Sequence, residues 1–238
     1  MPDIYATSDI HAPEYIHLLE KALEREKERI GKASLFILAG DIVSKGKYYY
    51  VAQVRRILLK YVKCPIIGVY GNEDYEEYES KYEELFPEVK WLNDEMLQVN
   101  LEGFQVTIIG TRGVLDEPTS WQRKHIPNIY EKYSKRLERI RMLLQEARGT
   151  VILVSHYAVT FKTLKGENPR IWPQMGSKKM EKIIAKYKPT IVIHGHSHKG
   201  IFEKYVVNGV RIYNVSLPAR KHIVRISLEK RPSLLSYL

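Results

Sequence analysis

The chain has 238 residues, of which 44% are hydrophobic and 28% are charged, and its formal net charge is +10 at pH 7. This balance indicates a globular, soluble protein with one large domain over residues 1–238, and it excludes an intrinsically disordered chain. The longest apolar runs are strand-sized, so we expect no membrane-spanning segment, and the single cysteine, Cys64, excludes an internal disulfide and fits a cytoplasmic location.

Strand-like and helix-like segments alternate over the first half of the chain. Apolar runs predict strands over residues 3–9, 35–41 and 65–72. Helices are expected between and after these strands, over residues 14–30, 48–62 and 75–85. A strand pair joined by Glu102 and Gly103 is then expected over residues 96–101 and 104–110.

The second half continues the alternation but ends differently. Further helices are predicted over residues 129–147 and 178–187, and further strands over residues 150–156 and 190–195. The tail from Ile201 to Leu228 predicts three antiparallel strands, with a hairpin turn at Asn208-Gly209. This order indicates an α/β fold with an antiparallel end. Two stretches fit neither pattern and are either surface insertions or functional loops, namely residues 112–128 and 157–177.

Side chains that can bind metal follow five of the predicted strands. They are Asp9, His11, Asp41, Asn72, His156, His196 and His198. In α/β sheets, ligands bind outside the carboxyl ends of the strands, so we expect these side chains to meet at one edge. Each one alone is explained by capping or turn chemistry. As an ordered set of oxygen and nitrogen donors without a thiolate, they indicate a site for Mn, Fe, Zn, Ni or Co.

Five short motifs in this order resemble the calcineurin-like metallophosphoesterase superfamily. They are Asp9-Ile10-His11, Gly40-Asp41, Gly71-Asn72, His156 and Gly195-His196-Ser197-His198. The resemblance implies a four-layer αββα sandwich, in which two mixed β-sheets are flanked by helices and the metal site lies at the carboxyl ends of the strands. It also implies two divalent metal ions that share Asp41. One would be held by Asp9, His11 and His198, and the other by Asn72, His156 and His196.

The chemistry that the resemblance implies is hydrolysis of a phosphate ester by a hydroxide that bridges the two ions. Mn, Fe, Ni, Co and Zn are all compatible with these donors, and Mn is our favoured ion. The third motif departs from the family pattern, because Glu73 stands where the family has a histidine beside the leaving oxygen. Some family members without this histidine resemble phosphodiesterases, so we expect phosphodiesters as substrates. Glu73 is then either a protonated catalytic acid or a positioning group.

Other side chains have weaker assignments. Arg112 follows the strand at residues 104–110 and is either a phosphate-binding group or part of a surface salt bridge. Asp74 is expected to orient a ligand rather than to bind metal. His194 is expected to be structural, because the family pattern has no ligand there. Four residues of the second long loop could form a wall of the substrate site, namely Tyr157, Lys162, Arg170 and Trp172.

The sequence therefore predicts a phosphoesterase that acts on a small phosphate ester, without a membrane partner. A nuclease of the same fold is an alternative, because a basic chain attracts nucleic acid. A second alternative is a metal-bound scaffold with weak catalysis, since the fold resembles that of a retromer subunit that binds protein. The physiological substrate and the oligomeric state do not follow from the sequence.

Overall fold

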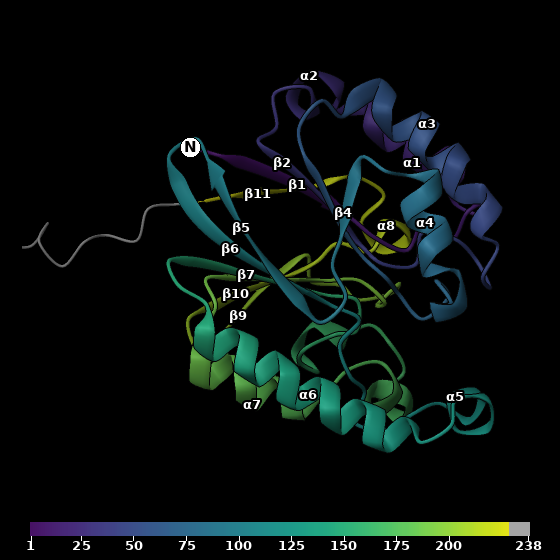
Figure 1. Cartoon of the computed structure of the whole chain (residues 1–238), viewed down its shortest axis with the longest axis vertical. Coiled ribbons are helices and arrows are strands. Elements are labelled where there is room, and N and C mark those ends of the chain that lie inside the picture. Colours follow the sequence, from purple (N-terminus) through teal and green to yellow (C-terminus); the bar gives the residue numbers. More distant parts are fainter. Residues whose placement is uncertain (229–238) are drawn as a thin grey trace, which may run out of the picture.

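The structure of the protein is a computed structural model that describes residues 1–228. The remaining residues of the predicted domain, 229–238, lie outside the described residues, and the single domain over 1–238 stays a prediction. Two β-sheets pack face to face and helices cover their outer faces (Figure 1). This arrangement confirms the four-layer αββα fold expected from the sequence.

The first sheet contains five strands in the described part of the chain. They are β1 (Asp3–Thr7), β2 (Leu35–Ala39), β3 (Ile66–Val69), β4 (Val89–Trp91) and β11 (Val224–Ser227). Their order is β11-β1-β2-β3-β4, with parallel pairing from β1 to β4. Side chains alternate across this sheet, as the twofold period of a strand requires. Tyr5 packs on the helix side, whereas Ile4 and Ala6 face the other sheet.

The second sheet contains six of the described strands. They are β5 (Glu95–Leu101), β6 (Phe104–Thr111), β7 (Thr150–Ser155), β8 (Ile191–His194), β9 (Lys204–Val207) and β10 (Val210–Asn214). Their order is β5-β6-β7-β8-β10-β9. Ile152 and Val154 face the first sheet, while Leu153 between them faces the outer helices. Each sheet is therefore buried on both faces, which explains the nearly continuous apolar runs in the sequence.

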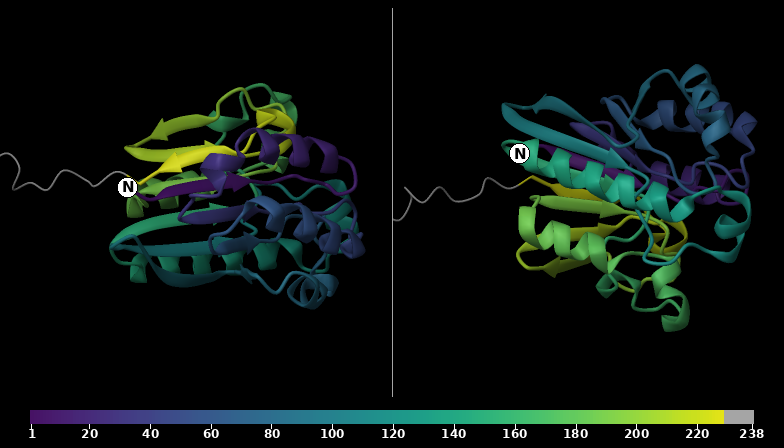
Figure 2. Two further views of the ribbon diagram at one scale, coloured as in Figure 1. Left: turned by 90° about the horizontal axis from the view of Figure 1, so that it is seen from above. Right: turned by 60° about the horizontal axis from the view of Figure 1, so that its bottom comes forward.

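Helices close both outer faces of the sandwich. The first sheet is covered by α1 (Ile16–Arg25), α3 (Val51–Tyr61) and α4 (Glu79–Leu85), and α2 (Lys27–Ile30) follows α1 directly. The second sheet is covered by α6 (Ile129–Glu146) and α7 (Lys178–Tyr187), which lie side by side (Figure 2). None of the helices within residues 1–228 has the length and apolarity to cross a bilayer.

The tail differs from the prediction of three consecutive antiparallel strands. Only β9 and β10 form the expected hairpin, where Asn208 and Gly209 have the positive φ angles of the predicted turn. Strand β10 then pairs parallel with β8. The short helix α8 (Leu217–Arg220) follows, and β11 crosses to the first sheet, where it pairs antiparallel with β1. Alternation shows which face of a strand is buried but not which strand it pairs with, and this explains the error.

The two unassigned stretches have short local structure. The first contains α5 (Ser120–His125), which begins with a capping box between Thr119 and Gln122. The second contains two 3₁₀ segments, Lys162–Leu164 and Pro169–Gln174. Both stretches follow strands of the second sheet at its carboxyl edge, so they border the place where the candidate ligands meet.

Candidate metal centre

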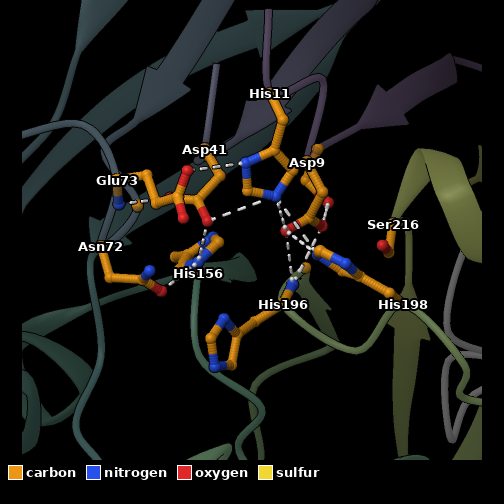
Figure 3. Close-up of polar contacts among 12 residues, drawn as sticks. Asp9, His11, Asp41, Asn72, Glu73, His156, His196, His198 and Ser216 are labelled. Atoms are coloured by element: carbon orange, nitrogen blue, oxygen red, sulfur yellow. Dashed lines mark hydrogen bonds and ion pairs between the residues drawn. The ribbon is translucent and has the colours of Figure 1, made fainter. Parts of the chain in front are cut away.

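The seven side chains expected to bind metal lie together at the carboxyl edge of both sheets (Figure 3). The first sheet contributes residues from the loops after β1, β2 and β3. They are Asp9, His11, Asp41 and Asn72. The second sheet contributes residues from the loops after β7 and β8. They are His156, His196 and His198.

One group of donors consists of Asp9, His11 and His198, whose ligand atoms lie within 4.8 Å of one another. Nε2 of His198 lies 3.1 Å from Oδ1 of Asp9 and 3.3 Å from Nε2 of His11. Asp9 and His11 are almost completely buried, and the His198 side chain is 36% exposed. This group therefore opens to solvent on the side of His198.

A second group consists of Asp41, His156 and His196, again within 4.8 Å of one another. Nε2 of His156 lies 3.3 Å from Oδ2 of Asp41 and 3.1 Å from the amide Oδ1 of Asn72. Its other ring nitrogen, Nδ1, donates to the backbone carbonyl of Ala39 at 3.0 Å. In the neutral imidazole that bond places the proton on Nδ1 and leaves Nε2 free to bind a metal ion, the usual arrangement for a metal-binding histidine.

Asp41 lies between the two groups. Its Oδ2 is 3.3 Å from Nε2 of His156 and 3.6 Å from Nε2 of His11, so one carboxylate oxygen faces a histidine of each group. Its Oδ1 accepts the backbone N–H of Glu73 at 2.8 Å, which fixes the carboxylate plane. This position is compatible with the bridging role that the family resemblance implies.

The backbone at this site adopts conformations that side chains other than glycine rarely take. Positive φ angles occur at Asp9 (55°), His11 (42°), Asp41 (52°) and His196 (64°). A left-handed conformation of this kind costs on the order of 1–3 kcal/mol per residue, and it persists only where the surroundings impose it. Four of the candidate ligands thus have strained backbone, a feature that clusters at functional sites in proteins.

Two glycines make room for these ligands. A Cβ at Gly71 would overlap the carboxylate and backbone nitrogen of Asp41. A Cβ at Gly40 would lie 2.6 Å from Nδ1 of His156, and Gly40 also has a φ of +88°. The glycines of the Gly-Asp and Gly-Asn motifs are therefore required by close contacts between loops far apart in sequence.

Electrostatics at the site favour a cation. Burial opposes the charged form of His11, but its hydrogen bond with Glu73 and the charges of Asp41 and Asp9 outweigh burial and raise the pKa to about 9. Burial likewise opposes the charged form of His156, yet Asp41 and Asp9 raise its pKa to about 9. His196 differs, since burial and the neighbouring His156 lower its pKa to about 3. The buried carboxylates therefore attract positive charge, which protons supply in the absence of metal.

The donor set fits divalent transition metal ions. Two carboxylates, an amide oxygen and four imidazoles converge without a thiolate, and the carboxylates already stabilise positive charge. His194, expected to be structural, is buried beside this site, and its Nδ1 lies 2.8 Å from the Gly195 carbonyl oxygen. It belongs to neither donor group within residues 1–228.

Glu73 contacts the site through His11. Its Oε2 lies 3.2 Å from Nδ1 of His11 and accepts the backbone N–H of Lys45 at 2.9 Å. Asp74 is fully buried and accepts hydrogen bonds from the backbone of Gly71 at 2.8 Å and from the Tyr82 hydroxyl at 2.8 Å. Asp74 thus holds the loop that carries Asn72, as expected for an orienting residue.

Arg112 is buried and has partners within the protein. It donates to Oε1 of Glu79 at 2.8 Å and to the carbonyl oxygen of Gly71. Since Gly71 follows β3 and Arg112 follows β6, this side chain ties the two sheets together beside the site. Its expected contact with phosphate stays a prediction.

Sequence patterns gave no signal for two further contacts at the site. The Ser8 hydroxyl donates to Oδ2 of Asp9 at 2.6 Å, and the Ala39 carbonyl orients His156. Ser8 directly precedes the first motif but has no distinctive spacing, and a backbone carbonyl carries no sequence signature. These partners can be found only from the three-dimensional structure.

A cleft of about 660 Å³ adjoins the metal centre at Asn72, Glu73 and His196. Tyr75, Trp121 and His125 stack along it, with ring centroids 6.0 Å apart for the first pair and 4.7 Å for the second. Of the four loop residues expected to form a substrate wall, only Tyr157 lines this cleft. Lys162 and Trp172 line a different pocket, and Arg170 is exposed.

Solved structures share this fold at low sequence identity. TT1561 of Thermus thermophilus matches with a TM-score of 0.58 and 17% identity, over 94% of this chain and 97% of that one. SoxB, the sulfate thiohydrolase of Thermus thermophilus, matches with a TM-score of 0.60 and 13% identity, over 94% of this chain and 53% of that one. GAP50, the anchor in the inner membrane complex of Plasmodium, matches with a TM-score of 0.55 and 10% identity, over 92% of this chain and 72% of that one. At these identities the likeness shows the fold alone.

No curated protein sequence matches the chain. A family model does, and the model described as calcineurin-like phosphoesterase covers residues 2–200. This match includes every candidate ligand from Asp9 to His198, and it confirms the resemblance expected from the five motifs. The chain therefore belongs to the calcineurin-like phosphoesterase family.

Proposed function

We propose that the protein is a phosphodiesterase that uses two divalent metal ions, with Mn²⁺ as the favoured ion. The observation that supports this proposal most directly is the position of Asp41, whose Oδ2 faces His11 of one donor group and His156 of the other. The first ion would be held by Asp9, His11 and His198, and the second by Asn72, His156 and His196. When bound, such ions act as Lewis acids that polarise phosphate oxygens and lower the pKa of water.

The residues of the chain prepare this site before substrate arrives. Ala39 and Glu73 fix the rings of His156 and His11, and the backbone N–H of Glu73 fixes the Asp41 carboxylate. Rigid donors need no rearrangement when charge develops on the phosphate, which is the main source of electrostatic catalysis. The adjoining cleft provides the space for the organic part of an ester.

The charge of the cleft favours a diester over a monoester. Four acidic residues line it, namely Glu73, Asp74, Glu76 and Glu77. Of the cations that line it, Arg112 pairs with Glu79 and Arg136 with Asp94, both outside the cleft, while Lys132 pairs with Glu76 of the cleft itself. A phosphodiester carries one negative charge and a monoester carries close to two near neutral pH, so these carboxylates repel the monoester more strongly.

Glu73 is proposed to be a positioning residue rather than a catalytic acid. Its Oε2 accepts the N–H of Lys45 and faces Nδ1 of His11, so it serves as an acceptor. A carboxylate that holds the far nitrogen of a metal-binding histidine is a common arrangement. No role as proton donor to the leaving oxygen follows from these contacts.

The test is hydrolysis by protein loaded with Mn²⁺, measured on bis(p-nitrophenyl) phosphate and on p-nitrophenyl phosphate. We expect faster turnover of the diester. Asp41→Asn and His156→Ala should each lower kcat/KM by more than about 100-fold, because even outer contacts of metal ligands are worth about 10–100-fold. His17→Ala, in an exposed residue of α1, is the control. Diester hydrolysis that persists in Asp41→Asn would contradict the proposal.

Two alternatives remain distinct proposals. A nuclease is favoured by the net charge of +10, and it predicts cleavage of single-stranded RNA or DNA that falls steeply with salt. A metal-bound scaffold is favoured by the fold shared with GAP50, and it predicts metal uptake without turnover. We propose a small phosphate ester as the substrate. We also propose that the protein is located in the cytoplasm.

A further inference from the structure

A second pocket of about 790 Å³ lies on the outer side of the second sheet and shares no lining residue with the cleft at the metal centre. It is formed by the loop at residues 157–177, by helix α7 and by the segment around β9. None of the candidate metal ligands lines it. The pocket is therefore separate from the metal centre, because the two have no lining residue in common.

Four half-buried aromatic rings line this pocket in two pairs. Phe161 and Trp172 have ring centroids 6.0 Å apart, and Phe202 and Tyr205 have centroids 5.1 Å apart. The Trp172 ring is fixed by a hydrogen bond from Nε1 to the carbonyl of Glu167 at 3.2 Å. Rings that are fixed and partly exposed offer stacking surfaces to a planar ligand.

Four exposed lysines surround these rings, namely Lys162, Lys165, Lys178 and Lys182. Lys178 Nζ lies 5.1 Å from the centroid of Phe161, and Lys165 Nζ lies 5.9 Å from that of Phe202. Within residues 1–228, none of the four ammonium groups forms an ion pair with a carboxylate. The acid that lines the pocket, Glu181, accepts a hydrogen bond from the Thr160 hydroxyl at 2.5 Å. With four lysines and one carboxylate in its lining, the pocket carries a net positive charge.

We propose that this pocket binds a mononucleotide, with the base stacked on the Trp172 ring and the phosphates held by the lysines. A planar ring joined to an anion is the chemistry that matches both features. The volume is that of a site for one small molecule. A single strand of nucleic acid needs a basic groove that continues along the backbone, whereas here the lysines surround one cavity.

The chain provides a reporter for this binding. It has three tryptophans, of which Trp91 is buried in the core and Trp121 lies at the metal-site cleft. In a Trp121→Phe background, a base that stacks in the pocket should change the fluorescence of Trp172. We expect saturable quenching on titration with ADP, and a much weaker effect with inorganic phosphate or adenosine, each of which lacks one half of the ligand.

Helix α7 supplies a matched pair of variants. Lys178→Gln with Lys182→Gln removes two pocket lysines, while Lys179→Gln with Lys186→Gln removes the same charge from exposed positions outside the pocket. The first double variant should weaken ADP binding by at least about tenfold, since it removes two charge-assisted hydrogen bonds to the phosphates. The second should change it less than about threefold, as expected for screened surface charges.

Three results would overturn the proposal. They are the absence of quenching at millimolar ADP, equal weakening by the two double variants, and tighter binding of a single-stranded oligoadenylate than of ADP by more than tenfold. Hydrolysis of bis(p-nitrophenyl) phosphate by the Mn²⁺-loaded Lys178/Lys182 variant should stay unchanged. If the Lys178/Lys182 variant loses both hydrolysis and ADP binding, the pocket is not a separate site. If the wild-type protein binds ADP but hydrolyses no diester, this site remains and the proposed diesterase is rejected.

Discussion

The two sheets supply different chemistry to the candidate metal centre. Loops of the first sheet carry both carboxylate ligands, Asp9 and Asp41, and one imidazole, His11. Loops of the second sheet contribute imidazoles, at His156, His196 and His198. Each donor group takes members from both sheets, so neither sheet alone can hold a metal ion with the full set. Metal binding in this protein is therefore a direct measure of how the two sheets are packed together.

The largest effect is expected where the first sheet places its shared carboxylate. Gly71→Ala puts a Cβ into the space of the Asp41 carboxylate, so we expect Mn²⁺ content and kcat/KM for bis(p-nitrophenyl) phosphate to fall by more than about 100-fold. Metal content is measured by atomic emission on the dialysed protein. Gly31→Ala is the control, since a Cβ at Gly31 would lie 3.2 Å from its nearest neighbour, the carbonyl oxygen of Lys27, which is not part of the metal centre. Wild-type metal content in Gly71→Ala would show that Asp41 is not a ligand.

The second prediction concerns the imidazole that the first sheet provides to the donor groups. Glu73→Ala removes the carboxylate that faces His11 Nδ1, and we expect Mn²⁺ affinity to fall by about 10–100-fold. Glu73→Gln keeps an acceptor oxygen and should recover most of this loss. A catalytic acid would instead lose turnover in both variants and leave Mn²⁺ affinity unchanged. Titration with Mn²⁺ by calorimetry separates affinity from turnover. Glu77→Ala, on the same cleft, should bind Mn²⁺ as the wild type does.

The third prediction tests the tie between the sheets. Arg112→Ala removes the side-chain donor of the Gly71 carbonyl and leaves the partly buried Glu79 with only the Asn93 amide as donor, so the free energy of unfolding should fall by about 2–3 kcal/mol. Guanidinium unfolding of the metal-free protein measures this change. Arg55→Ala breaks an exposed pair with Glu88 and should cost at most about 1 kcal/mol. Equal losses in the two variants would mean that burial beside the site gives Arg112 no special role.

The smallest effect is expected at an exposed link between the sheets. His222, just before β11, lies 2.7 Å from Glu203, which precedes β9. The hydrogen bond with Glu203 raises the pKa of His222 above 6.5, and the same bond lowers the pKa of Glu203 below 4.5. The stabilisation from the histidine is complete below pH 6.5 and disappears as pH rises through its raised pKa. That from the glutamate is complete above pH 4.5 and disappears as pH falls through its lowered pKa.

His222→Gln should therefore lower the free energy of unfolding only in mildly acidic solution, by at most about 1 kcal/mol. Urea unfolding at pH 5.5 and at pH 9 measures the difference between the two conditions. His17→Gln, in an exposed residue of α1, controls for the loss of a titrating histidine. A loss that is as large at pH 9 as at pH 5.5 would exclude the ion pair as its cause.

Much of the fold could be predicted from the sequence because local periodicity reports local burial. The apolar runs that became β1, β2, β3, β7 and β8 are buried on both faces, so their strands were recognisable without knowledge of their neighbours. The pairing partner of β11 could not be predicted, because its pairing with β1 joins residues more than 200 positions apart. The short strand β4 was also missed, since three residues carry too little pattern.

The sequence by itself determined which residues stand at the ends of the strands, and therefore the kinds of donor available and the family of the chain. The tertiary structure alone decided how those donors are used. The left-handed backbone at Asp9 and Asp41, the contact of Glu73 with His11, and the second pocket beside α7 all depend on groups brought together from distant segments. The alternation of apolar residues shows which face of a strand is buried. Which residues pack against that face is set by the packing of the whole molecule.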